Sequence, residues 1–148
     1  KGVSTDIYIA TNEQEIRSEL LDEKDGHTLR LVLLPFIRLP GQQAFFPGLL
    51  GLLKMETYDL IQVHEDSQVT SLIVSLYARE RKISIVLCQG MYHDYKGIAH
   101  LLQILYNFVA YPILRSNIKT CIAKTGMARD YLTKKGFVNP VVCPIGRC

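Results

Sequence analysis

The sequence predicts an α/β domain built on a doubly wound parallel sheet with helices on both faces. Short apolar runs rich in β-branched residues alternate along the chain with longer stretches of helical periodicity, and this alternation is typical of parallel βαβ units. Several short runs contain almost no polar residues, as strands buried on both faces do. The length of 148 residues corresponds to one domain with a single hydrophobic core.

Composition and charge exclude several classes of protein. Hydrophobic residues make up 48% and charged residues 21% of the chain, which excludes a disordered or fibrous protein. The net charge is only +3, and the basic residues form no block that could follow a phosphate backbone, so nucleic acid is not an expected partner. The four cysteines have neither Cys-x-x-Cys nor zinc-ligand spacing, so we expect buried, reduced thiols and no metal.

The first third of the chain contains two expected strands. Residues 3–10 are β-branched and apolar, whereas residues 11–24 are polar and acidic. Residues 29–34 (LRLVLL) form a continuous apolar run that predicts a strand buried on both faces. Residues 38–51 contain prolines and glycines, so we expect a loop that enters a short helix near Leu49.

The middle of the chain contains the clearest helix. Residues 59–63 predict a short strand, and the apolar residues of 67–82 then recur at spacings of three and four. Asp66 or Ser67 can cap the first turn of this helix. Residues 83–87 (ISIVL) predict the next buried strand.

The last part of the chain repeats this alternation. Residues 118–123 predict a strand, and Thr125 is placed to cap a helix that ends with a left-handed residue at Gly136. Residues 141–143 predict a last short strand. Ligands of such sheets bind just beyond the carboxyl ends of the strands. We therefore expect a polar site formed by residues 35–38, 64–66, 88–93, 124–125 and 144–147.

Residues 98–114 are apolar enough to suggest contact with a membrane. The segment has only about 17 residues and contains Pro112, so it falls short of the roughly 20 needed to span a bilayer. We expect a helix of the core that Pro112 kinks or ends. An apolar edge that rests on a membrane beside Arg115 and Lys119 is the alternative.

Four segments at the expected strand ends, taken in order, resemble a known family. They are YDLIQVHED, ISIVLCQGMY, IKTCIAKTGMARDYLTKKGF and VVCPIGRC. This order resembles the amino-terminal domain of group 1 (family 4-like) glycosyltransferases, which are retaining enzymes of the GT-B fold. The resemblance implies that residues 1–148 are one Rossmann-like, acceptor-side domain. It also implies that the first strand, its Gly-rich loop and the second domain lie outside this sequence.

The resemblance implies a function for the whole enzyme. A sugar would pass from a nucleotide-sugar, bound through the second domain, to a glycan or lipid-linked saccharide presented by this half. No cofactor besides the nucleotide-sugar substrate is implied, and residues 1–148 alone are expected to be inactive. We expect a cytoplasmic protein, with peripheral contact to the cytoplasmic face of a membrane as a further possibility.

Site residues carried over from the resemblance lie at the strand ends. His64 and Gln89 are the expected catalytic residues, and Gln89 stands where the family commonly has a histidine. Gly146 lies at the turn toward the donor side. The expected acceptor-binding residues are Glu65, Gly90, Met91, Tyr92, Lys124 and Thr125.

Simpler interpretations stand beside each of these roles. His64 can bridge to the neighbouring carboxylates, Gln89 and Gly90 can form a plain turn, and Thr125 can be an ordinary helix cap, as can Asp66. Two other functions also fit a sheet of this type. They are one half of a GT-B-type epimerase and a non-catalytic, Rossmann-like domain that binds a small ligand.

Overall fold

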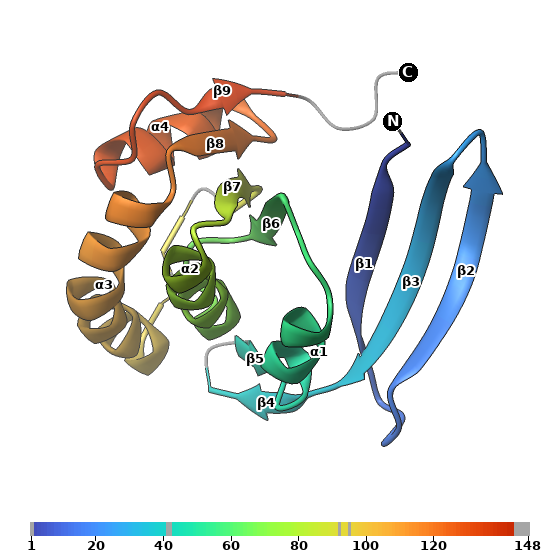
Figure 1. Cartoon of the computed structure of the whole chain (residues 1–148). Coiled ribbons are helices and arrows are strands. Elements are labelled where there is room, and N and C mark those ends of the chain that lie inside the picture. The colour runs from blue at the N-terminus through green and yellow to red at the C-terminus, as the bar shows by residue number, and fades with distance from the viewer. Residues whose placement is uncertain (1, 41–42, 92, 95, 144–148) are drawn as a thin grey trace. The chain divides into compact units, whose positions relative to one another are not determined.

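The structure is a computed structural model that describes residues 2–40, 43–91, 93–94 and 96–143 (Figure 1). Its contacts divide the chain into two compact units. We call Lys1–Arg38 with Ala44–Glu56 the N-terminal unit, and Leu39–Gln43 with Thr57–Cys148 the C-terminal unit. The chain had been expected to form one domain, and each unit is described separately below.

The N-terminal unit contains a three-stranded mixed sheet. β1 (Ser4–Thr11) pairs in parallel with β3 (His27–Pro35), and β2 (Arg17–Lys24) pairs with the other edge of β3 in antiparallel orientation. α1 (Leu49–Met55) belongs to the same unit. β4 (Ile37–Leu39) and β5 (Gln43–Phe45) form a separate two-stranded sheet.

The β2–β3 hairpin is a correction to the sequence-based prediction. The polar segment 11–24 was given no strand, and a purely parallel sheet was expected. The turn between β2 and β3 consists of Asp25 and Gly26, both with positive φ, at 52° and 77°. Asp-Gly is the pair that two-residue hairpin turns favour, because both central residues need a left-handed backbone. This dipeptide was the signal that the prediction missed.

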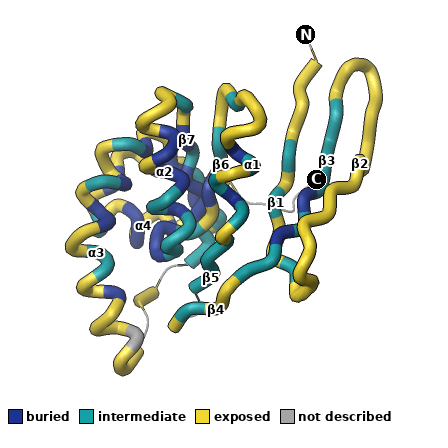
Figure 2. The backbone as a smooth tube through the Cα atoms, turned by 60° about the horizontal axis from the view of Figure 1, so that its bottom comes forward, coloured by how far each residue is buried: buried dark blue, intermediate teal, exposed yellow. Residues whose placement is uncertain are grey.

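Burial in this sheet is also lower than predicted. Val32 and Leu34 are buried, at 4% and 1% exposure, but the other residues of β3 are half-buried or exposed. β2 is exposed along its whole length (Figure 2). The prediction that residues 29–34 are covered on both faces was therefore wrong.

The C-terminal unit is an α/β structure with a four-stranded parallel sheet. Its strands are β6 (Leu60–His64), β7 (Ser84–Gln89), β8 (Thr120–Ala123) and β9 (Val141–Val142), hydrogen-bonded in that order. They alternate with α2 (Val69–Arg81), α3 (Ile98–Asn117) and α4 (Gly126–Lys134). The parallel α/β prediction is confirmed for this part of the chain.

The three helices cover one face of this sheet. Val63, Leu87 and Cys121 are buried, whereas Ser84 and Thr120, which point to the opposite face, are exposed. Neighbouring parallel strands that follow one another in sequence and are joined by crossovers of one hand place their helices on the same side of the sheet. Within the C-terminal unit, α2, α3 and α4 therefore lie on one face, where helices on both faces were expected.

α3 differs from its prediction in two respects. Pro112 lies within the helix, which continues to Asn117, so the proline does not end it. The apolar side of α3 is also not part of the core, because Ile98 and Phe108 are each 82% exposed. Among the described residues, no helix is both long and apolar enough to cross a membrane.

Candidate functional site

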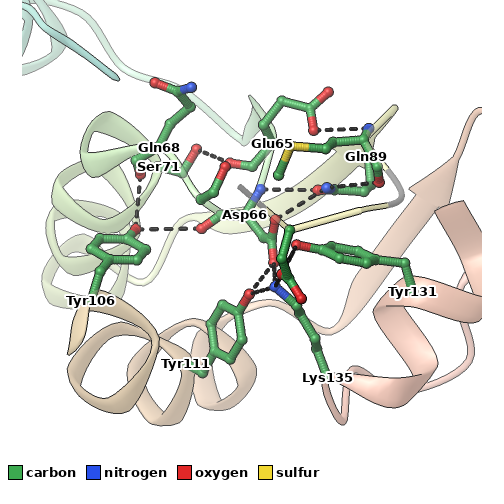
Figure 3. Close-up of polar contacts among 12 residues, drawn as sticks. Glu65, Asp66, Gln68, Ser71, Gln89, Tyr106, Tyr111, Tyr131 and Lys135 are labelled. Atoms are coloured by element: carbon green, nitrogen blue, oxygen red, sulfur yellow. Dashed lines mark hydrogen bonds and ion pairs between the residues drawn. The ribbon is translucent and has the colours of Figure 1, made fainter. Parts of the chain in front are cut away.

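A buried polar cluster lies where β6 and β7 end, with Asp66 at its centre (Figure 3). The Asp66 side chain is fully buried and accepts hydrogen bonds from Tyr111 Oη (2.7 Å) and Gln89 Nε2 (3.1 Å). The Asp66 main-chain N–H in turn donates to Gln89 Oε1 at 2.9 Å. The two residues are therefore joined in both directions, which links the end of β6 to the end of β7.

Lys135 and Asp94 complete the charges of this cluster. Lys135 Nζ lies 3.9 Å from Asp66 Oδ2 and 2.9 Å from Asp94 Oδ1, and it also contacts the hydroxyls of Tyr111 and Tyr131. Burial raises the pKa of Asp66, while the charge of Lys135 and the hydrogen bonds from Tyr111 and Gln89 oppose that rise. Burial also acts to raise the pKa of Asp94, but the hydrogen bond and charge of Lys135 outweigh it, and this pKa is lowered.

The structure corrects the expected helix-capping role of Asp66. α2 begins at Val69, and the residue at its cap position, Gln68, makes no side-chain cap. The N–H of Val69 donates instead to Oε1 of Gln43 at 2.8 Å, and the amide nitrogen of Gln43 donates to the Ser67 carbonyl. A distant glutamine therefore satisfies the start of the helix, and Asp66 is available to the buried cluster.

Gln89 is a positioning residue in this geometry. Its side chain is fully buried. Its amide oxygen accepts from Asp66, and its amide nitrogen donates to Asp66 and, at 3.2 Å, to the Met91 carbonyl. Both amide hydrogens are thus engaged within the protein. The expectation that Gln89 contacts a substrate is not met, because the side chain faces inward.

Glu65 fixes the loop that follows β7. Its two carboxylate oxygens accept from the main-chain N–H groups of Gly90 and Met91, each at 3.1 Å. Glu65 itself has a left-handed backbone, with φ of 64°. Its N–H donates to the Cys88 carbonyl at 3.1 Å, and its carbonyl accepts from Ser71 Oγ at 2.8 Å. These bonds hold an uncommon conformation at the strand end.

Gly90 lies between a carboxylate and an ammonium side chain. A Cβ at this position would lie 3.1 Å from Glu65 Oε1 and 3.1 Å from Cδ of Lys124. The absence of a side chain therefore lets these two residues from different strand ends approach each other. Lys124 follows β8 directly, and its N–H donates to the Gln89 carbonyl at 2.9 Å.

His64 and Thr125 have well-defined local partners. His64 is exposed at the end of β6, and its Nε2 lies 2.8 Å from Nε2 of Gln62. Partial burial of the ring and the positive charge of Lys124 lower the pKa of His64, and the charge of Glu65 opposes them. Thr125 accepts from the Ala128 N–H at 3.1 Å, which confirms the interpretation of Thr125 as an ordinary helix cap.

The structure brings together only part of the expected site. Glu65, Gly90, Met91 and Lys124 meet at the carboxyl edge of β6–β8. Tyr92 and Gly146 lie outside the described residues.

Sequence reasoning missed the inner cluster of Asp94, Tyr106, Tyr111, Tyr131 and Lys135. A weak signal was available in α3, where polar residues recur at helical spacing along one side: Gln103, Tyr106, Asn107 and Tyr111.

Fold and site together define an α/β protein whose parallel sheet carries a polar cluster at its carboxyl edge. The described residues contain no group of three or more His, Cys, Asp or Glu side chains placed to hold a metal ion. In comparisons with known proteins, no family model, no curated protein and no solved structure matches the chain.

Proposed function

We propose that the C-terminal unit is the acceptor-side, Rossmann-like half of a retaining GT-B glycosyltransferase. One observation supports this most. Glu65, Gly90 and Lys124, three residues named from the family resemblance, lie side by side at the edge where parallel sheets bind ligands. A carboxylate and an ammonium group across a glycine can accept from and donate to the hydroxyls of a saccharide.

His64 has a distinct role in this proposal. Its lowered pKa keeps the imidazole neutral near physiological pH. Because the amide nitrogen of Gln62 can only donate, Nε2 of His64 accepts that bond and Nδ1 carries the ring proton. The Nδ1–H group would then donate to an oxygen of the bound saccharide.

The reaction would depend mainly on positioning. A nucleotide-sugar held by a second domain would meet the acceptor hydroxyl at this edge, and fixed dipoles and charges would stabilise the transition state. Gln89 and Asp66 would act indirectly, because they hold the strand ends that carry Glu65 and Gly90.

The test uses the natural polypeptide that contains this sequence, assayed for nucleotide release from UDP- and GDP-sugars with glycan and lipid-linked acceptors. Lys124→Ala is expected to lower kcat/KM for the acceptor about tenfold or more, since one hydrogen bond from a charged group is lost. Lys134→Ala is the matched control, because Lys134 is exposed in the last turn of α4, at the other end of that helix from Lys124 and Thr125.

The outcomes separate the alternative functions. Interconversion of the nucleotide-sugar without transfer would identify an epimerase instead. A protein that binds no nucleotide-sugar by calorimetry would contradict both enzyme classes and leave the small-ligand-binding domain.

A further inference from the structure

The outer side of α3 forms a continuous apolar stripe. Its members recur at spacings of three and four along the 20-residue helix, so they share one side. Ile98 and Phe108 are 82% exposed and Leu105 is 66% exposed. We call this stripe the apolar face of α3, and it consists of Ile98, Leu101, Leu102, Ile104, Leu105, Phe108 and Val109.

The inner side of α3 is held by polar contacts. Asn117 Nδ2 donates to the hydroxyl and the carbonyl of Ser75 at 3.0 and 3.2 Å. Tyr106 Oη donates to the Gln68 carbonyl at 2.9 Å, and Tyr111 Oη donates to Asp66. Turning the apolar face inward would break all of these bonds and bury their partners unsatisfied. The contacts therefore fix the apolar face outward.

The charged residues on α3 and next to it in the sequence have one sign. No Asp or Glu occurs between Asp94 and Asp130, and Asp94 is paired with Lys135. Lys96 is exposed just before the helix. Arg115 is exposed in its last turn, and Lys119 is exposed just after it. An apolar stripe with cationic groups at both ends complements a surface that is apolar below and anionic above.

We propose that α3 docks lengthwise on the surface of an anionic lipid bilayer, with its apolar face in the headgroup and acyl boundary. A helix of 20 residues is about 30 Å long, enough to lie in the interface, while no described helix could cross the bilayer. A second copy of the chain fits less well. Both ends of the face are basic, so pairing in either direction would place like charges together. The proposal does not depend on glycosyl transfer.

Co-flotation of the 148-residue chain with lipid vesicles tests the proposal. Binding is expected to vesicles of phosphatidylcholine with phosphatidylglycerol, and weaker binding to phosphatidylcholine alone or at high salt. The affinity of the double variant Leu105→Ser/Phe108→Ser for the vesicles is expected to fall by at least about tenfold, since two large apolar contacts are lost. Lys96→Glu is expected to weaken binding to the anionic vesicles by about tenfold.

Matched variants keep the test specific. Met127→Ser/Val138→Ser removes two apolar side chains of similar exposure elsewhere in the same unit, 61% and 63%, and Lys134→Glu reverses a charge on α4. Both are expected to bind as the wild type does, and circular dichroism would establish that all variants are folded. Equal binding by all variants would overturn the proposal. The proposal would also be overturned if the wild type did not bind vesicles and sedimented as a dimer, while Leu105→Ser/Phe108→Ser sedimented as a monomer. That result would identify the apolar face of α3 as an interface between copies of the chain.

Discussion

The polar residues at the ends of β6 and β7 bond to buried partners inside the protein. Gln89 and Asp66 exchange hydrogen bonds between neighbouring strands, and Tyr111 and Lys135 bring two helices to the same carboxylate. A glutamine at a strand end can face a ligand or the core, and its neighbours in sequence do not decide between these. The decision depends on an aspartate more than twenty positions earlier, which local patterns do not reveal.

Replacement of Gln89 is expected to affect stability first. Gln89→Ala removes three hydrogen bonds and leaves the Asp66 N–H and the Met91 carbonyl without this partner. The free energy of unfolding should fall by about 2–4 kcal/mol, as measured by urea denaturation followed by circular dichroism. Gln62→Ala is the control, because that glutamine is exposed on β6, and its effect should stay within about 0.5 kcal/mol. Equal effects of the two substitutions would contradict the positioning role.

The buried carboxyl of Asp66 predicts a specific pH dependence. Its pKa in the folded protein is raised, chiefly by burial, above the ordinary value of 3.8. Between these two values the folded state binds more protons than the unfolded state, so this contribution to stability is lost as pH rises through the folded pKa. As pH is raised from about 4 to about 7, the free energy of unfolding of the wild type should therefore fall relative to that of Asp66→Asn.

His64 does not disturb this comparison. Its pKa is lowered in the folded protein, which makes stability rise with pH, but the effect is present in both proteins and cancels in the difference. A difference that stays constant with pH would mean that the folded Asp66 carboxyl titrates as it does in the unfolded chain.

At the scale of elements, periodicity located α2, α3 and α4 because each has a regular apolar or capped pattern. It could not decide which side of α3 faces inward. An apolar stripe is normally the buried one. Here Tyr106, Tyr111 and Asn117 bond to partners on α2 and in the loop between β6 and α2, and these bonds turn the polar side of α3 inward. The polar side of α3 shows only a weak pattern in the sequence, and the distant partners of these bonds cannot be identified from it. Both ends of α4, in contrast, are capped by local residues, and Thr125 and Gly136 were predicted correctly, whereas the cap expected at Asp66 for α2 was not.

The end of α4 provides a test at this scale. Gly136 has φ of 80°, and the N–H groups of Gly136 and Phe137 donate to the carbonyls of Thr133 and Leu132, as in a Schellman cap. Gly136→Ala should lower the free energy of unfolding by about 1–2 kcal/mol, because an L-residue is strained there. Gly126→Ala at the start of the same helix has open space around it and should be neutral or stabilising by up to about 1 kcal/mol. Thermal or urea unfolding of both variants measures the difference, and equal signs would contradict this account of the cap.

At the scale of the whole molecule, the two units differ in how much apolar surface they bury. Within the described residues, the buried hydrophobic side chains of the N-terminal unit are Val32, Leu34, Leu49 and Leu53, and all others lie in the C-terminal unit. The sequence length suggested one domain because composition and periodicity do not show which strands pair. The separation follows from β1 and β2 both pairing with β3 and not with β6–β9.

Because the N-terminal unit buries fewer apolar side chains than the C-terminal unit, we expect it to unfold locally first. Local stability follows the apolar contacts that each unit buries. In native-state hydrogen exchange, amides of β1 and β3 should exchange faster than those of β7. Leu34 and Leu87 are 1% and 0% exposed, which makes a matched pair of core truncations costing about 2–5 kcal/mol each. Leu34→Ala should accelerate exchange in β1 and β3 and leave β7 protected, whereas Leu87→Ala should accelerate β7. If Leu34→Ala exposed β7 to the same degree, the two units would unfold as one cooperative structure, and their division would carry no energetic meaning.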